Sequence, residues 1–468
     1  MPRLLITLLC ISALSAIAQP AARPNILFCI ADDWGYPHAG AYGDKAAKPP
    51  AFDKLAKEGA LFTRAFSAAP SCTASRASIL TGQAPHRLGV GTNLWSDLPA
   101  KYAVYPELLE KSGYAIGKMR KAWGPGKLQD RPRDPAGPNF KSFEDFLKAA
   151  PGDKPFCFWL GSPDPHRPYE RAFGQASGID PKSVTVPPYI PDTAETRADI
   201  VDYLAEVQRF DSDVAAAIDL LEKKGLANNT IVVATGDNGW PWPHSKANLY
   251  DTGTRQPLAV RWPGKIKPGT VIDRLTILTD LAPTFLELSG NPIPADMTGQ
   301  SLVSLLKGET VPQREAIFVE RERHAKCREG NVGYPMRAIR TEKYLYIRNF
   351  FPDRWPAGDP DQAYSQGIFG DIDAGPTKWH ILEKKDDPAY ANYLRWATAK
   401  RPAEELFEVT TDPHSLKNLA DDPKLAETKK ELAAKLQTWM TDTKDLRATD
   451  PQTTAWDTYE YYSPEKRK

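Results

Sequence analysis

The segment Thr230-Ile231-Val232-Val233-Ala234-Thr235-Gly236-Asp237-Asn238-Gly239 lies near the middle of a chain of 468 residues. Its first six residues are apolar or β-branched without a break, which is typical of a strand buried on both faces of a parallel sheet. The segment before it, Asp199 to Gly225, has apolar residues at helical spacing and predicts a long packing helix. A helix followed by a buried strand predicts an α/β fold, which places its sites at the carboxyl ends of the strands.

Polar oxygen-bearing side chains follow two of the expected strands. The apolar run Asn25 to Ile30 ends in Asp32-Asp33, and the run from Thr230 ends in Asp237-Asn238. Adjacent carboxylates at the end of a buried strand repel each other and lose hydration, so we expect a cation between them. Oxygen ligands suit calcium better than zinc. The two motifs together predict one calcium site, although a solvated Asp-Asp turn would explain the first motif alone.

A lone thiol begins a third segment, Ser71-Cys72-Thr73-Ala74-Ser75-Arg76-Ala77-Ser78-Ile79-Leu80-Thr81-Gly82. The segment predicts a short helix with Cys72 at its start and Arg76 one turn later. Unpaired N–H groups at a helix start and a guanidinium fork can bind a tetrahedral oxyanion. A buried structural cysteine followed by a surface arginine is the alternative. Because an exported chain with few cysteines does not depend on disulfides, Cys72 is expected to serve chemistry.

The start of the chain predicts export. Residues 1–18 combine Arg3, an apolar run from Leu4 to Leu14 and a small-residue cleavage site, as in a secretory signal peptide. The run is too short to span a membrane, and no membrane anchor is expected. Lysine and arginine (60) nearly balance aspartate and glutamate (59), so the net charge gives no argument for a nucleic-acid partner.

Three further stretches carry candidate residues. Gly113 to Gly126 runs from a strand into a glycine-rich loop that contains Lys121 and Trp123. His166 stands between two prolines just beyond the expected strand Phe156 to Leu160, where it is stiffened and able to donate to an oxygen. Lys246 follows the Asp237-Asn238 motif. Surface lysines and a structural histidine are the alternatives.

Five motifs, Asp32-Asp33, Cys72 to Gly82, Gly113 to Trp123, Pro165-His166 and Asp237 to Lys246, resemble in their order the motifs of the type I sulfatases. Within that family the chain is most similar to the N-sulfoglucosamine sulfohydrolases (sulfamidases). The resemblance implies an alkaline-phosphatase-like α/β domain over residues 24–331, with a central, mostly parallel sheet between helices. It implies a smaller C-terminal domain over residues 332–468, with an antiparallel sheet and a helix.

The same resemblance implies the roles of the site residues. A formylglycine-generating maturation enzyme would oxidise Cys72 to formylglycine, which acts as nucleophile and as a calcium ligand beside Asp32, Asp33, Asp237 and Asn238. Arg76, Lys121 and Lys246 would neutralise the sulfate, and His166 would protonate the leaving atom.

One position departs from the family. Alignment on Gly113-Tyr114 puts Trp123 where the family usually has the histidine that helps to eliminate sulfate. Trp123 is expected to form a wall of the sugar pocket. The base is left unassigned among His166, His86 and the metal-bound carboxylates.

Substrate recognition is expected near Glu320 to His324. If this segment is extended, Glu322 and His324 lie on the same face as Glu320 and form an edge that could bind a sugar, which we call the sugar-reading edge. The alternative is a salt-bridged surface strand.

The expected activity is hydrolysis of sulfate from a sulfated saccharide, with N-sulfoglucosamine favoured. The alternatives are an O-sulfatase, a phosphodiesterase or phosphonate hydrolase on the same fold, and an inactive carbohydrate-binding relative. The expected location is periplasmic or secreted, or lysosomal in a eukaryote.

Overall fold

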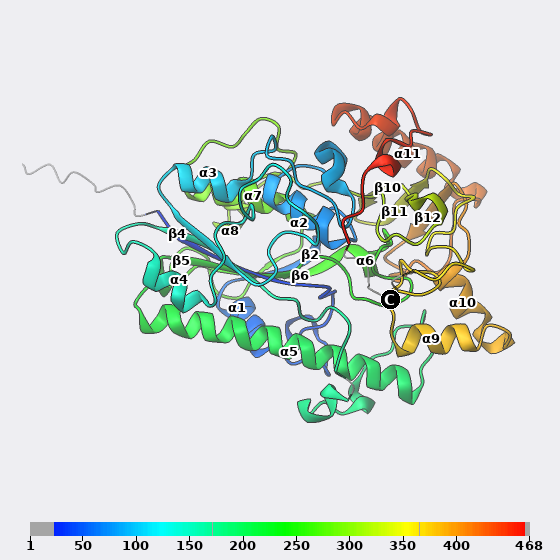
Figure 1. Cartoon of the computed structure of the whole chain (residues 1–468), viewed down its shortest axis with the longest axis horizontal. Coiled ribbons are helices and arrows are strands. Elements are labelled where there is room, and N and C mark those ends of the chain that lie inside the picture. The colour runs from blue at the N-terminus through cyan, green and yellow to red at the C-terminus, as the bar shows by residue number, and fades with distance from the viewer. Residues whose placement is uncertain (1–22, 171, 365, 464–468) are drawn as a thin grey trace, which may run out of the picture.

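The computed structural model describes residues 23–170, 172–364 and 366–463. The expected signal peptide, residues 1–18, lies outside the described residues. The described chain forms a large mixed sheet between two layers of helices, and a smaller antiparallel sheet beside it (Figure 1).

Parallel strands form the centre of the large sheet, as expected. Strand β1 (Asn25–Ala31) lies between β4 (Phe156–Gly161) and β5 (Thr230–Gly236), with β3 (Ala115–Met119) parallel to β4 on the outer side. Every residue of β1, β4 and β5 is buried, which explains their nearly continuous apolar sequences.

The other half of the sheet contains the antiparallel pairs. Strand β6 (Arg255–Arg261) runs antiparallel to β5 and to β2 (Ala60–Phe66), while β7 (Thr270–Ile272) and β8 (Thr276–Ile277) pair in parallel with β2. The sheet is therefore mostly parallel, with one reversed strand.

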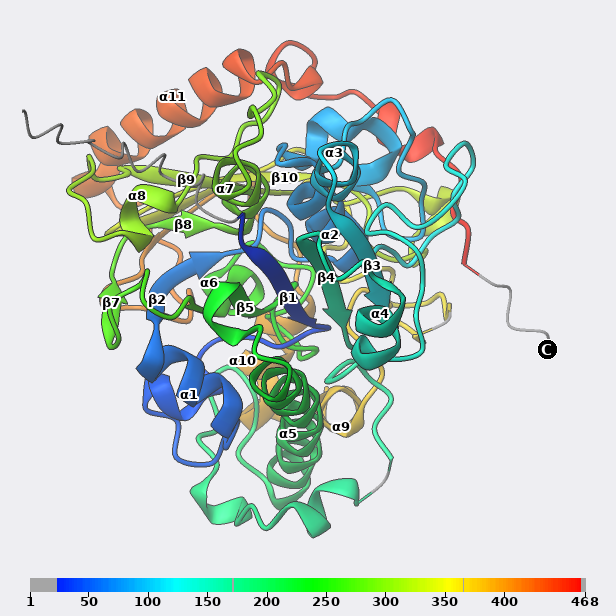
Figure 2. The ribbon, with the colours of Figure 1, turned by 90° about the vertical axis from the view of Figure 1, so that its left-hand side faces the viewer.

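Helices cover both faces of this sheet, and Figure 2 shows α1 and α5 on the side opposite α2, α3 and α7. The first layer contains α1 (Pro50–Glu58), α4 (Phe143–Ala149) and α5 (Ala194–Lys223). The second contains α2 (Cys72–Thr81), α3 (Tyr105–Lys111), α7 (Leu281–Leu288) and α8 (Val303–Leu306). The helices of each layer pack against one face of the sheet and form a separate hydrophobic cluster with it.

The smaller sheet has the strand order β12-β11-β10-β9 and is antiparallel throughout. Its strands are β9 (Ala316–Arg321), β10 (Met336–Thr341), β11 (Tyr344–Asn349) and β12 (Glu404–Glu408). Strand β9 belongs to this sheet although it precedes residue 332, where the sequence predicts the domain boundary.

The last long helix, α11 (Ala426–Asp442), packs on the outer face of the small sheet through Leu432, Leu436 and Met440. The inner face packs against Phe66, Leu249 and Tyr250 of the large unit.

The described residues also contain three short helices, which are α6 (Asp251–Thr254), α9 (Pro376–Glu383) and α10 (Ala391–Thr398). None of the helices in the described residues is both long and apolar enough to cross a membrane.

Candidate active site

Three carboxylates meet at the carboxyl edge of the large sheet. Ligand oxygens of Asp32, Asp33 and Asp237 lie within 4.8 Å of one another, and all three side chains are buried. Asp33 adopts a left-handed backbone conformation (φ 70°), and its N–H donates to Asp237 Oδ1 at 2.9 Å. The ends of β1 and β5 therefore place these groups together, as the two sequence motifs predicted.

Asn238 completes this set of oxygen donors. Its Nδ2 donates to Asp33 Oδ1 at 2.7 Å, whereas its Oδ1 is buried and has no hydrogen-bond partner in the described part of the chain. A buried carbonyl oxygen without a donor is costly unless another group binds it. Three carboxylates and one free amide oxygen fit a hard divalent cation that prefers oxygen ligands.

Cys72 is the first residue of α2 and lies against these carboxylates. Its thiol donates to Asp32 Oδ1 across 3.2 Å and is buried. Burial, together with the charge of Asp32, raises the pKa of the Cys72 thiol well above its usual value. Since the thiolate is the reactive form of cysteine, this environment disfavours the unmodified side chain as a nucleophile.

The guanidinium of Arg76 makes four hydrogen bonds within the protein. Its Nε donates to Asp237 Oδ2 at 2.7 Å, and the remaining nitrogens donate to the backbone carbonyls of Lys121, Ala122 and Ala31. The side chain is fully buried. Arg76 therefore fixes Asp237 and the loop after β3, and its expected contact with sulfate stays a prediction.

The two lysines expected at the site both reach it. Lys121 Nζ donates to Asp32 Oδ2, and Lys246 Nζ donates to Asp33 Oδ2 at 2.7 Å. Burial works against ionisation of Asp32, but Lys121, His166 and Arg76 outweigh it and hold the pKa of this carboxyl well below its usual range. The carboxylates and the lysines therefore stabilise each other's charged forms.

Lys246 has a second partner that sequence reasoning missed. Its Nζ donates to Asp373 Oδ2 at 2.8 Å, and Asp373 is only 6% exposed. Burial alone would lower the pKa of Lys246, but Asp33 and Asp373 raise it well above its usual value, so the ammonium form persists. Asp373 lies in an irregular segment before α9, and no pattern in the surrounding sequence marks it.

His166 lies at the open side of the cluster. A ring nitrogen of His166 lies within 4.8 Å of Cys72 Sγ and of an Asp32 carboxylate oxygen, and the side chain is 31% exposed. Its Nδ1 is hydrogen-bonded to the Arg167 carbonyl, so Nδ1 carries a proton and the neutral ring keeps its lone pair on Nε2. Nε2 lies 3.9 Å from Asp33 Oδ2 and is free to exchange a proton with a bound molecule.

Trp123 is a core residue. It is 8% exposed and belongs to the same hydrophobic cluster as Leu88 and Leu98, between the large sheet and the α2 layer. Its Nε1 is buried without a partner among the described residues. The structure therefore places the indole in the core, and its expected role as a wall of the sugar pocket stays a prediction.

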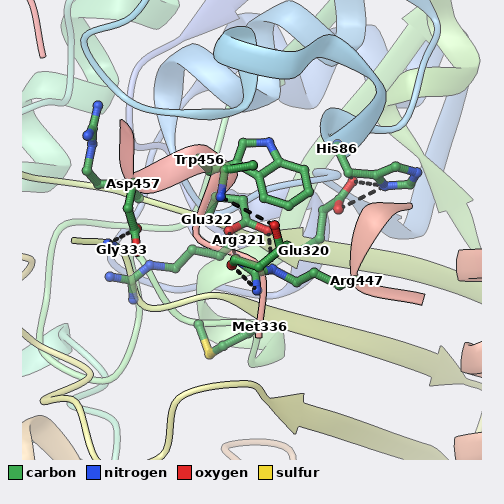
Figure 3. A network of polar contacts seen from close by, with 12 residues as sticks. His86, Glu320, Arg321, Glu322, Gly333, Met336, Arg447, Trp456 and Asp457 are labelled. Carbon is green, nitrogen blue, oxygen red and sulfur yellow. Dashed lines mark hydrogen bonds and ion pairs between the residues drawn. The ribbon is translucent and has the colours of Figure 1, made fainter. Parts of the chain in front are cut away.

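Glu322 and His86 lie in a separate buried network between the two units (Figure 3). Arg447 forms two hydrogen bonds with Glu322, both at 2.8 Å, and His86 Nδ1 lies 3.0 Å from both Glu320 carboxylate oxygens. Glu322 is 2% exposed, so its expected place on a sugar-reading edge is wrong. The ion pairs of the alternative are present, but they are buried and do not lie on a surface strand. His86 is excluded as a base because it belongs to this network.

His324 lies close to the nucleophile position. Its Nδ1 is 2.9 Å from the Oγ of Ser71, the residue before Cys72, and the side chain is buried. Burial lowers the pKa of His324 to about 3, so the ring is neutral near pH 7. With 3% of its surface exposed, His324 supports the start of α2 and has little area for a sugar.

This arrangement defines a hydrolase site for a tetrahedral oxyanion, with a nucleophile position, a cluster of oxygen ligands and flanking lysines. The comparisons with known proteins agree. A family model described as sulfatase matches residues 24–291, and one described as N-sulphoglucosamine sulphohydrolase, C-terminal, matches residues 236–362. The chain therefore belongs to the sulfatase family and hydrolyses sulfate groups from a sulfated carbohydrate.

Three similar proteins illustrate the range of this family. The N-sulphoglucosamine sulphohydrolase of Homo sapiens is 31% identical, over 93% of this chain and 94% of the relative. An ulvan-active sulfatase of Formosa agariphila is 29% identical, over 90% of this chain and 75% of the relative. A solved structure in complex with its substrate D-glucosamine-2-N,6-O-disulfate has a TM-score of 0.64 at 20% identity, over 94% of this chain and 100% of that one. The last likeness supports the fold alone.

Proposed function

We propose that this protein is an exported sulfatase that removes the sulfate from N-sulfated glucosamine in a sulfated saccharide. In this proposal a maturation enzyme converts Cys72 to formylglycine, and calcium is bound beside it. The observation that carries the proposal is the position of Cys72, whose thiol is buried against Asp32 at 3.2 Å. A thiolate is disfavoured at this place, whereas a neutral oxygen nucleophile beside a cation is not.

Asp32, Asp33, Asp237 and Asn238 would hold calcium, and the buried, unpartnered Asn238 Oδ1 supports this ligand set. When present, formylglycine supplies a nucleophilic oxygen in place of the thiol, and calcium supplies a Lewis acid for the sulfate oxygens. Lys121 and Lys246 place two ammonium groups beside the same carboxylates, where they balance the charge of the sulfate.

His166 moves protons in this proposal. Its Nδ1 is held by the Arg167 carbonyl, so its Nε2, when protonated, can give a proton to the leaving nitrogen or oxygen, and the neutral ring that results can accept one when sulfate is released. Trp123 and His86 take no part in the second step, because one is core and the other belongs to the network of Glu320.

The substrate assignment has two candidates. Identity of 31% to an N-sulphoglucosamine sulphohydrolase over nearly the whole chain favours the N-sulfate. Identity of 29% to an ulvan-active sulfatase favours an O-sulfated polysaccharide. We choose the N-sulfate because the model of the N-sulphoglucosamine sulphohydrolase C-terminal region also matches residues 236–362, which include Lys246.

The test is sulfate release from D-glucosamine 2-N-sulfate by protein purified from a host that has the maturation enzyme. We expect turnover by the wild type and none by Cys72→Ala, with unchanged thermal unfolding of the variant. Near wild-type activity of Cys72→Ala would contradict the assigned nucleophile. Release of sulfate from an O-sulfated polysaccharide alone would favour the second candidate.

A further inference from the structure

The segment that carries Asp373 is fixed from two sides. Arg321 and Arg328 both pair with the carboxylate of Asp371, and Asp371 Oδ1 accepts the N–H of Ala325 at 2.8 Å. These contacts hold the backbone two residues before Asp373. The segment is therefore anchored at Asp371 by buried ion pairs.

Lys378 fixes the same segment from the side of α9. Its Nζ donates to the carbonyls of Gln366, Phe369 and Ile372 at 2.8 to 3.1 Å, so all three ammonium protons are used. A side chain held on such a backbone keeps one position when a ligand binds.

Only one oxygen of Asp373 is used by the protein. Its Oδ2 accepts from Lys246 at 2.8 Å, whereas no hydrogen bond to its Oδ1 is found within residues 23–170, 172–364 and 366–463. Asp373 retains a small exposed surface of 6%. The carboxylate therefore has a free acceptor at the edge of the active site.

This carboxylate lies beside the group that serves the leaving atom. A carboxylate oxygen of Asp373, a ring nitrogen of His166 and a carboxylate oxygen of Asp33 lie within 4.8 Å of one another. Two groups at this separation can both contact one atom placed between them, because a hydrogen bond spans about 2.7 to 3.2 Å. The atom between His166 and Asp373 would be the one that links the sugar to sulfur.

From this geometry we infer that Asp373 is a specificity-determining residue that accepts a hydrogen bond from the bridging N–H of a sulfamate and disfavours the bridging oxygen of a sulfate ester. The inference rests on the proposed function and specifies its substrate. An ionised carboxylate has only acceptor sites. It attracts the N–H of R–NH–SO₃⁻, and it repels the lone pairs of the oxygen in R–O–SO₃⁻. Such a site favours the sulfamate by attraction and disfavours the sulfate ester by repulsion.

The decisive experiment uses two substrates that differ in the bridging atom, D-glucosamine 2-N-sulfate and D-glucose 2-sulfate. The ratio of their kcat/KM values is measured for the wild type and for Asp373→Asn. The asparagine carbonyl can still accept from Lys246, but the amide NH₂ presents a donor at the free position. We expect the preference for the N-sulfate to fall by roughly 10- to 100-fold, which is the effect of losing one hydrogen bond to a charged group.

Two further variants serve as controls. Asp361→Asn removes an exposed carboxylate from the same region of the chain, and we expect an unchanged ratio. Asp373→Glu keeps the acceptor, and we expect it to retain the preference even if its rate is lower. Equal losses on both substrates in Asp373→Asn would overturn the inference, because Asp373 would then only position Lys246.

Binding to Cys72→Ala, measured by calorimetry with calcium present, separates this inference from the proposed function. If the wild type cleaves neither compound, the proposed function fails. If Cys72→Ala binds the N-sulfate more tightly than the ester, and the added Asp373→Asn substitution abolishes this difference, the role of Asp373 is still supported. Equal binding of both compounds to Cys72→Ala would overturn it. A wild type that cleaves only the ester would overturn both proposals.

Discussion

The guanidinium of Arg76 donates from Nε to Asp237 Oδ2 at 2.7 Å, and neither side chain is exposed to solvent. This ion pair joins α2, which carries Cys72, to the end of β5, which carries two of the expected metal ligands. Removing one partner of such a pair leaves a buried charge without compensation.

Arg76→Ala is therefore expected to lower the free energy of unfolding by about 3–5 kcal/mol, as measured in urea. Arg76→Lys is also expected to destabilise the protein, because one ammonium group cannot reach the acceptors that the guanidinium fork reaches. Lys430→Ala, which removes an exposed pair with Glu427, is the control and should change stability little. Unchanged stability of Arg76→Ala together with lost activity would instead place the guanidinium on the substrate.

Glu322→Ala distinguishes a buried ion pair from a sugar contact. Because Arg447 and Arg337 both donate to this carboxylate, we expect a loss of about 3–5 kcal/mol in the free energy of unfolding. The KM of the protein that remains folded should stay close to that of the wild type. A raised KM with unchanged stability would restore the sugar-reading role that the sequence suggested.

The centre of the fold and most of the site were predictable because their signals are local. Buried parallel strands are read from apolar runs such as Thr230 to Thr235, and the polar residues that follow them meet at one edge of the sheet. Asp32 and Asp237 are far apart in the sequence, yet the parallel register of β1 and β5 brings them together.

The errors concern residues whose partners come from distant segments. The alternation of charges at Glu320 to His324 indicates an extended strand, but nothing near it reveals that Arg447 covers Glu322. Arg76 has the spacing of an anion ligand, but nothing in its own segment reveals that Ala31 at the end of β1 and Lys121 after β3 accept its hydrogen bonds. Asp373 has no local pattern at all, and only the packing of its segment against Lys246 identifies it.

Asp211 is expected to make stability depend on pH. Its carboxylate accepts the N–H groups of Ala51 and Phe52 at the start of α1, yet burial raises its pKa to about 6. The folded state therefore holds this proton more tightly than the unfolded state, whose carboxyl titrates near 4. Stability from this group is present below pH 4 and is lost as the pH rises through 6, by an amount of order 3 kcal/mol.

The measurement is the free energy of unfolding in urea at pH 4 and at pH 6.5, for the wild type and for Asp211→Asn. We expect the free energy of unfolding of Asp211→Asn, relative to that of the wild type, to be higher at pH 6.5 than at pH 4. The same difference at both pH values would show that Asp211 has an ordinary pKa in the folded protein.

Removal of the metal is expected to destabilise the protein. Without a cation, Asp32, Asp33 and Asp237 keep their mutual repulsion, which the lysines offset only in part. A chelator should therefore lower the Tm, and added calcium should restore it in a concentration-dependent manner. Asn238→Ala should weaken this restoration, because Asn238 Oδ1 has no partner in the protein that would replace the metal. Restoration by zinc and not by calcium would contradict the assigned ligand chemistry.

The proposed reaction requires that Cys72 is converted from a thiol to an aldehyde before the protein acts. The direct measurement is the mass of the tryptic peptide that contains Cys72, taken from protein of known specific activity. We predict that the peptide carries an aldehyde at position 72, that this aldehyde reacts with a hydrazide probe, and that activity rises in proportion to the converted fraction. A fully active preparation in which Cys72 is an unmodified thiol would contradict the account.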